Sequence, residues 1–167
     1  MSELKRFIQD VPDFPKPGIL FRDIAPLLRD HFADTLRTLE ALLSDAEWTG
    51  IDAVAGIESR GFILGAALAA RRRKGFVLVR KQGKLPPPVH HLDYKLEYGA
   101  GTLEVQPGHG RLVLVDDVLA TGGTLAGAAQ LCTQAGFQVS ALAVLIDLAL
   151  RPDFCWRQLI PRVAIRY

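Results

Sequence analysis

The stretch from Val113 to Thr124 constrains the fold most, because an apolar run ends in two acidic residues and then opens into small residues. Residues 112–115 are all apolar, which is typical of a strand buried on both faces of a parallel sheet. Asp116 and Asp117 then fall at the carboxyl end of that strand. Ligands of open α/β sheets bind at this edge, so the sequence predicts an α/β fold with its site beside the two aspartates.

The residues after the two acids predict a phosphate-binding turn. Gly122 and Gly123 allow the backbone to close around an anion, Thr121 and Thr124 add hydroxyl donors, and a helix N-terminus favours negative charge. The turn has neither a Walker Gly-Lys-Ser/Thr nor a dinucleotide Gly-x-Gly-x-x-Gly. Because successive strand residues point to opposite sides, one carboxylate would bind a sugar diol and the other a basic partner or a metal-bound water. The predicted ligand is a ribose 5-phosphate unit, and the alternative is an ordinary turn after a solvated strand end.

This stretch resembles the phosphoribosyl pyrophosphate signature of type I phosphoribosyltransferases. The resemblance implies a central, mostly parallel sheet flanked by helices, with a small N-terminal hood segment and a flexible lid loop. It also implies that one group of residues binds the ribose 5-phosphate: Asp116, Asp117, Ala120, Thr121, Gly122, Gly123 and Thr124.

Composition predicts one domain over residues 1–167, since 49% hydrophobic and 23% charged residues suit a globular chain with an ample core. The basic run from Arg71 to Lys74 closes an apolar stretch as a helix C-terminus would, so nucleic acid is not an expected partner. The longest apolar run is too short to span a membrane, and residues 1–10 are polar and charged without the apolar stretch of a signal peptide, which predicts a cytoplasmic protein. Cys132 and Cys155 are expected in the core.

Residues 13–26 are too rich in proline for a helix yet carry aromatic and branched side chains, which predicts an ordered irregular segment. Its backbone could hydrogen-bond a planar ligand beside a stacking aromatic ring, or it could be a terminal arm packed on the core. The segment resembles the amino-terminal part of adenine phosphoribosyltransferases. The resemblance implies that the backbone of Leu20 contacts the Watson–Crick edge of adenine and that Phe21 stacks on the ring. Arg22 would lie along the other edge, and Leu119 would cover the opposite face.

Two further segments predict a second anion site at the same sheet edge. Ile51 to Ala55 is expected to form a strand that leads through a turn into a helix over residues 62–70. Phe76 to Val79 predicts a third strand, followed at once by basic residues that could otherwise merely solvate its end. The resemblance implies a cis peptide bond at residues 58–59. It further implies that the pyrophosphate is bound by Glu58, Ser59, Arg60, Arg80, Lys81, Lys84 and Tyr98.

The connection from Gly83 to Leu103 is long for a compact domain, which predicts a lid that closes over the site. Glu97 and Tyr98 resemble the lid pair of the family, and Glu97 could control the proton on the purine imidazole ring. His90 and His91 depart from the pattern and are expected to be exposed loop residues.

The remaining segments are expected to form scaffold. One helix is predicted from Phe32 to Ala46, and a buried strand from Val139 to Ile146 is expected to complete the core. Asp147 could enter the site or start a turn. The predicted organisation is a base-binding hood over about residues 5–26, a core over about 30–148 and a lid over about 83–103.

Together these features predict purine salvage: transfer of phosphoribosyl from phosphoribosyl pyrophosphate to N9 of adenine, giving AMP and pyrophosphate. Arg60, Asp117 and Glu97 would be catalytic. Mg²⁺ would be held by the donor and by water near Asp116 and Asp117, without a direct protein ligand. Arg80 would reach across a homodimer interface, as in related enzymes. The alternatives are an enzyme for a 6-oxopurine (hypoxanthine, guanine or xanthine) and a regulator that senses phosphoribosyl pyrophosphate.

Overall fold

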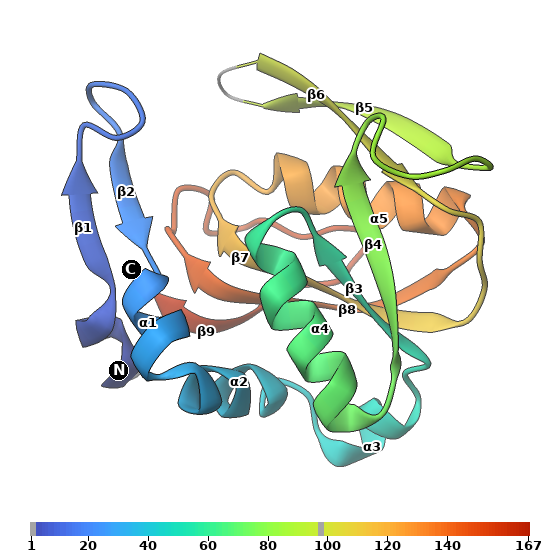
Figure 1. Ribbon diagram of the computed structural model, residues 1–167, viewed down its shortest axis with the longest axis horizontal. Helices are drawn as coiled ribbons and strands as arrows, with labels where there is room; N and C mark the ends of the chain where they lie inside the picture. The colour runs from blue at the N-terminus through green and yellow to red at the C-terminus, as the bar shows by residue number, and fades with distance from the viewer. Residues whose placement is uncertain (1–2, 97–98) are drawn as a thin grey trace.

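The computed structural model describes residues 3–96 and 99–167, which form an α/β fold around a central sheet (Figure 1). Within these residues the sheet has seven strands in the order β5-β6-β4-β3-β7-β8-β9. The five strands from β4 to β9 in this order run parallel, whereas β5 and β6 are antiparallel to their neighbours. The prediction of a mostly parallel sheet flanked by helices is confirmed. The strands are β3 (Ala53–Ile57), β4 (Gly75–Lys81), β5 (His90–Leu96), β6 (Gly99–Val105), β7 (Arg111–Leu119), β8 (Gln138–Asp147) and β9 (Arg162–Arg166).

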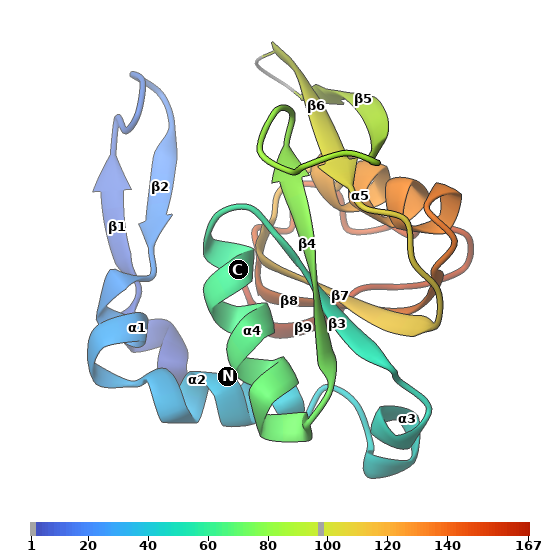
Figure 2. The same ribbon diagram turned by 45° about the vertical axis from the view of Figure 1, so that its right-hand side comes forward.

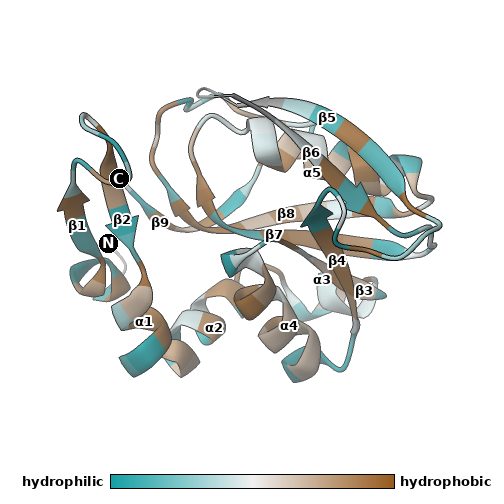
Figure 3. Ribbon diagram, turned by 45° about the horizontal axis from the view of Figure 1, so that its top comes forward, coloured by the Kyte–Doolittle hydropathy of each residue, from teal (hydrophilic) through white to brown (hydrophobic). Residues whose placement is uncertain are grey.

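Helices cover both faces of the sheet, and the central strands between them are strongly hydrophobic (Figure 3). On β7, Val113 and Val115 pack in a core with α2 and α4, while Leu112 and Leu114 pack in a second core with α5. Because successive residues face opposite cores, residues 112–115 are all apolar, as predicted. The helices are α1 (Ala25–Asp30), α2 (Phe32–Glu40), α3 (Asp45–Thr49), α4 (Arg60–Arg72) and α5 (Gly123–Gln134), and residues Glu3–Phe7 form a 3₁₀ helix. No helix among the described residues is both long and apolar enough to cross a membrane.

The predicted single helix from Phe32 to Ala46 is wrong, because the chain breaks it into α2 and α3. Ser44 and Glu47 form a capping box that starts α3: the Glu47 N–H donates to Ser44 Oγ, and the Ser44 N–H donates to Glu47 Oε2 at 2.8 Å. Arg162 of β9 also binds the Glu47 carboxylate, and these hydrogen bonds lower the pKa of Glu47 to about 2. The break allows the Trp48 side chain to be buried, with Nε1 donating to the Glu40 carbonyl at 2.9 Å.

The proline-rich segment is irregular over residues 13–19, as predicted, but residues 20–23 form a strand, so the segment is part of a β-hairpin. Strands β1 (Gln9–Pro12) and β2 (Leu20–Asp23) pair antiparallel and stand apart from the central sheet (Figure 2). Pro15 and Pro17 lie in the connection between the strands, where a missing N–H costs no ladder hydrogen bond. The apolar side chains of this segment differ in burial: Ile24 is buried, whereas Phe14 and Leu20 are 50% and 47% exposed.

Most of the predicted lid is also a hairpin, formed by β5 and β6 and lying above α5 in Figure 1. His90 and His91 are therefore strand residues rather than loop residues; His91 is exposed and His90 is half-buried. Arg80 and Lys81 were predicted to follow the third strand, but they are the last two residues of β4.

The strand-like sequence at the end of the chain, residues 162–167, forms a strand of the central sheet over Arg162–Arg166. Strand β9 pairs in parallel with β8, so the core is not complete at Ile146. Asp147 starts a turn, since its carboxylate accepts the Ala149 N–H at 2.8 Å, and it also binds Arg166 of β9 at 3.1 Å. Cys132 is buried as expected, but Cys155 is exposed, and that part of the prediction is wrong.

We expect Ser44→Ala to lower the free energy of unfolding by about 1 kcal/mol, because the amides at the start of α3 lose their side-chain acceptor. Urea denaturation measures the change. Ser44→Thr keeps the hydroxyl and serves as the control. Equal stability of the alanine and threonine variants would contradict the proposed contribution of the cap.

Candidate active site

The two acids lie within β7, which continues to Leu119 beyond the predicted end of the strand. Asp116 and Asp117 are each only 8% exposed. The Asp117 N–H donates to Asp116 Oδ1 at 2.9 Å. Burial raises the pKa of Asp116 well above its usual range, and the neighbouring charge of Asp117 raises it further. The two carboxylates therefore form a desolvated acidic pair that favours a proton or an external donor.

Arg60, the first residue of α4, approaches the second acid. Its Nε lies 2.7 Å from Asp117 Oδ2, and its guanidinium lies 5.0 Å from the centroid of the Phe21 ring. The contact is an ion pair whose angles are not those of a hydrogen bond. Among the described residues, no donor forms a hydrogen bond with the buried Asp117 Oδ2. Arg60 thus joins the hairpin to the acids, while one acid oxygen still has acceptor capacity for a ligand.

Gly61 allows the start of α4 to lie this close to β7. A Cβ atom at Gly61 would be 3.0 Å from the Val115 carbonyl oxygen and 3.2 Å from Asp116 Oδ1. Such contacts are tighter than most real Cβ contacts, so a larger residue would push Arg60 and the two acids apart.

The residues predicted to bind a phosphate, called the phosphate turn below, form a turn between β7 and α5. Gly122 has φ +86°, which favours glycine, and it is the N-cap of α5. Thr121, Gly123 and Thr124 are partly exposed, so their polar groups can reach a ligand. Ala120 is also partly exposed and precedes the turn. A helix N-terminus with accessible amides is suited to a phosphate.

The turn is supported from behind by Phe154, a residue that the sequence analysis missed. Phe154 is buried, and a Cβ atom at Gly122 would lie 2.2 Å from its ring. Gly122 is therefore required by both its backbone conformation and its contact with the ring. No local pattern in the sequence indicates this contact, because it joins positions far apart in the chain.

Tyr94 of β5 connects the second hairpin to the same turn. Burial raises the pKa of the Tyr94 hydroxyl, and the neighbouring Thr124 side chain opposes that shift. A Cβ atom at Gly101 would lie 2.9 Å from the Tyr94 ring, so β6 packs closely on it. The hairpin thereby contacts the phosphate turn directly. Tyr94 was also missed by the sequence analysis. Glu97 and Tyr98, the predicted lid pair, lie outside the described residues.

Most of the predicted pyrophosphate residues converge at the ends of β3 and β4. The Glu58–Ser59 peptide bond is cis, and Ser59 is the N-cap of α4. Glu58 Oε2 accepts hydrogen bonds from Arg80 Nε at 3.2 Å and from the Lys81 N–H at 3.0 Å. Burial opposes ionisation of Glu58, but these hydrogen bonds outweigh it and lower the pKa of Glu58. Lys84 is exposed beyond them, and its carbonyl accepts from Arg80 Nη1 at 3.3 Å.

The predicted base-binding residues have different surroundings. Phe21 makes an edge contact with Phe14 at 5.1 Å and faces Arg60. Arg22 points elsewhere: its guanidinium is paired with Asp10 and lies 4.0 Å from the centroid of the Tyr167 ring. Leu119 is buried in the core on the α5 side and has little free surface for a base. The structure thus brings Phe21 to the acids, but not the Arg22 and Leu119 side chains.

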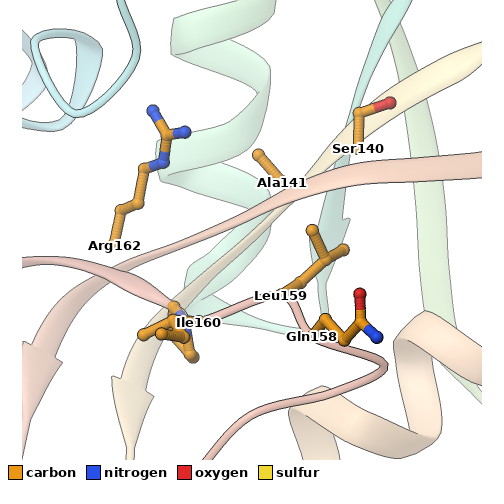
Figure 4. A pocket seen from close by; sticks show the side chains of 7 residues that line it. Ser140, Ala141, Gln158, Leu159, Ile160 and Arg162 are labelled. Atoms are coloured by element: carbon orange, nitrogen blue, oxygen red, sulfur yellow. The ribbon is translucent and has the colours of Figure 1, made fainter.

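A separate cavity of about 380 Å³ lies against β8 and the segment before β9 (Figure 4). It is lined by Ser140, Gln158 and Ile160 among others, with Arg162 at its rim. The Arg162 guanidinium is already bound by Glu47 and by the Leu42 carbonyl at 2.8 Å. The cavity shares no residue with the acids or the phosphate turn, so it is not part of the candidate site.

Comparison with known proteins points to one family. Residues 28–153 match the model of the phosphoribosyl transferase domain. The adenine phosphoribosyltransferase of Bdellovibrio bacteriovorus is 54% identical over 147 residues, which cover 87% of this chain and 88% of that protein. The crystal structure of adenine phosphoribosyltransferase from Rhodothermus marinus is 40% identical, with a TM-score of 0.86 and coverage of 98% and 96%. The enzyme from Saccharomyces cerevisiae, complexed with an imino-altritol bisphosphate and adenine, is 33% identical, with a TM-score of 0.87 and coverage of 97% and 96%.

We expect Asp116→Asn to stabilise the protein without ligand at neutral pH. The pKa of Asp116 is raised in the folded state, so the native protein binds more protons than the unfolded chain. Its unfolding free energy therefore falls as the pH rises from about 4, the usual aspartate pKa, through the folded pKa. Asparagine removes this loss. The expected gain is at least about 1 kcal/mol at pH 7 and vanishes below about pH 4.

Thermal unfolding of both proteins between pH 3 and pH 8 measures the effect. Asp153→Asn, a change at an exposed aspartate, is the control and should follow the wild-type curve. If the melting temperatures of wild type and Asp116→Asn changed with pH in the same way, Asp116 would not be a destabilising buried charge.

Proposed function

The chain belongs to the phosphoribosyl transferase family, and we propose that it transfers the 5-phosphoribosyl group from phosphoribosyl pyrophosphate to N9 of adenine, giving AMP and pyrophosphate. It is a pentosyltransferase of purine salvage. The observation that carries this proposal is the contact series from Phe21 through Arg60 to Asp117. An aromatic face for a base, a cation for a leaving pyrophosphate and an acceptor for a ribose hydroxyl lie next to one another there.

Selectivity for adenine is proposed to come from the backbone of Leu20. Pro12 lies opposite Leu20 in the hairpin. Because proline has no N–H, Pro12 cannot donate a hydrogen bond to the Leu20 carbonyl. A carbonyl that accepts from the exocyclic amine of adenine would face the oxygen of a 6-oxopurine instead. Two acceptors facing each other disfavour that base by about 1–3 kcal/mol. Phe21 would stack on the base, whereas the Arg22 side chain lies against Asp10 and Tyr167 and the Leu119 side chain lies in the core.

The acidic pair is proposed to bind the ribose hydroxyls, and the turn from Ala120 to Thr124 the 5-phosphate. The desolvated Asp117 carboxylate, whose Oδ2 is ion-paired with Arg60, and the raised pKa of Asp116 support this, since a ribose hydroxyl or a cation would stabilise both buried acids. These acceptors also suit a hydrated Mg²⁺ carried by the donor, with no direct protein ligand. When bound, Mg²⁺ would neutralise part of the pyrophosphate charge.

The residues of the chain contribute mainly position and charge. Arg60 would leave Asp117 and bind the pyrophosphate, and Asp117 would then be free to bind the ribose. Positive charge from Arg80, Lys81 and Lys84 would balance the negative charge that develops on the leaving pyrophosphate. Holding both substrates in line can supply about 7–11 kcal/mol of the barrier. Glu58 and Ser59 would shape the loop beneath the pyrophosphate, and Tyr98 would close over it. Glu97 would set the proton on the imidazole ring of the base.

We propose a cytoplasmic homodimer. Ile63 on α4 and Leu78 on β4 are exposed apolar side chains, as at an interface between subunits. Arg80 lies on the same strand as Leu78 and would contribute to the neighbouring site. The hood, core and lid are proposed to act as parts of one domain.

We expect turnover when the protein is incubated with Mg²⁺, phosphoribosyl pyrophosphate and adenine, but not with hypoxanthine, guanine or xanthine. Release of pyrophosphate and formation of the nucleotide measure the reaction. Turnover of a 6-oxopurine alone would establish the other purine specificity. Donor binding without turnover of any purine would instead identify a sensor of phosphoribosyl pyrophosphate.

We expect Arg60→Ala to lower kcat/KM by about 10²–10³, because the charge at the leaving pyrophosphate is lost. Steady-state kinetics with adenine measure the loss, and the melting temperature shows whether the fold is retained. Arg73→Ala, at the other end of α4, is the matched control and should keep its activity. Full activity of a folded Arg60→Ala protein would remove Arg60 from the mechanism.

A further inference from the structure

Glu104 on β6 is a buried acid that the proposed mechanism does not use. It is 1% exposed, and its carboxylate accepts hydrogen bonds from three successive backbone amides. Gly83 donates at 2.9 Å and Lys84 at 2.6 Å, and Leu85 donates to the same oxygen as Lys84. Consecutive amides that converge in this way form an anion-binding concavity. Here the anion is a side chain of the protein itself.

The loop held by Glu104 carries residues proposed to bind pyrophosphate. Lys84 is in its centre, and the Lys84 carbonyl accepts from Arg80 Nη1 at 3.3 Å. Arg80 is also the residue directly opposite Glu104 in the pairing of β4 with β6. Glu104 therefore binds the backbone at Lys84 and lies opposite Arg80 in the strand pairing, but it does not bind the charged end of either side chain.

The hydrogen bonds of Glu104 require a carboxylate. Burial by itself would raise the pKa of Glu104, but the three amides outweigh burial and lower it, so the group is ionised at neutral pH. A carboxylate has acceptor capacity at both oxygens, whereas an amide has one acceptor oxygen and a donor that would face the loop amides. Few other contacts hold this segment: Gln82 N–H donates to the Thr102 carbonyl at 3.0 Å, and Gln106 Nε2 donates to the Pro86 carbonyl at 3.1 Å.

We propose that Glu104 is a positioning residue for the donor: its carboxylate holds residues 83–85 so that Lys84, together with Arg80, meets the pyrophosphate of phosphoribosyl pyrophosphate. The inference rests on the proposed function and extends it to a residue that touches no substrate. The effect is specific to the pyrophosphate, because the acids, the phosphate turn and the Phe21 ring belong to other elements. Glu104 thus controls affinity for the donor and for pyrophosphate, but not for adenine or AMP.

The test compares Glu104→Gln with wild type in steady-state kinetics and in calorimetric titration with magnesium pyrophosphate. We expect the KM for phosphoribosyl pyrophosphate to rise about tenfold and the affinity for magnesium pyrophosphate to fall equally. The KM for adenine, the affinity for AMP and kcat should change less than twofold. Asp93→Asn is the matched control, since Asp93 lies on the same hairpin and its exposed carboxylate accepts from Thr102 Oγ1 at 2.6 Å.

A double-mutant cycle with Lys84→Ala tests whether Glu104 acts through Lys84. If it does, Glu104→Gln has little further effect on the donor KM once Lys84 is removed. Additive effects, unchanged pyrophosphate affinity, or equal losses for both substrates would overturn the inference. If Glu104→Gln does not fold, Glu104→Asp, which keeps the charge but shortens the reach, replaces it in the same measurements. Failure of the wild-type protein to bind magnesium pyrophosphate or to turn over adenine would instead overturn the proposed function.

Discussion

The burial of two adjacent carboxylates near the carboxyl end of β7 is the constraint that organises the elements around them. Asp116 and Asp117 are desolvated next to each other, so the protein must supply a cation or leave the pair partly protonated. The parallel order of β3 and β7 places the start of α4, and with it Arg60, beside the acids. The start of α5 follows in the same crevice, as expected where neighbouring crossovers of an open α/β sheet lie side by side. The cation and the phosphate turn are thus both consequences of the strand order.

The cations of the site are already paired with carboxylates of the protein. Arg60 lies against Asp117, and Arg80 is bonded to Glu58. These pairs balance charge before the donor arrives, which keeps like charges from repelling one another across the crevice. The same pairs must be loosened when an anionic donor binds, so part of the new interaction energy is spent on exchange of partners. Under the proposed function, this exchange of partners would favour a donor that brings its own cation.

The sequence predicted the parts of the fold and site that depend on local patterns. The apolar run before Asp116, the basic end of α4 and the glycine turn at Gly122 each have a short-range cause that periodicity or residue type reveals. The break between α2 and α3 also has a local signal, the Ser44–Glu47 capping box. The helical spacing of the apolar residues continues across this break and therefore predicted one helix. The contacts of Phe154 with Gly122 and of Glu104 with residues 83–85 have none, because each joins segments that become neighbours only through the tertiary fold.

The contact of Tyr167 with the hood has a consequence for the order of folding. Its ring lies between Lys5 and Arg22, each 4.0 Å from the centroid, and Lys5 Nζ also donates to the Arg166 carbonyl at 3.0 Å. The hood precedes β9 along the chain, so during synthesis it emerges from the ribosome well before β9 does. The hairpin of β1 and β2 must therefore remain without the contact of Tyr167 until the segment that follows β9 has been made, so this side of the molecule is completed after the central strands.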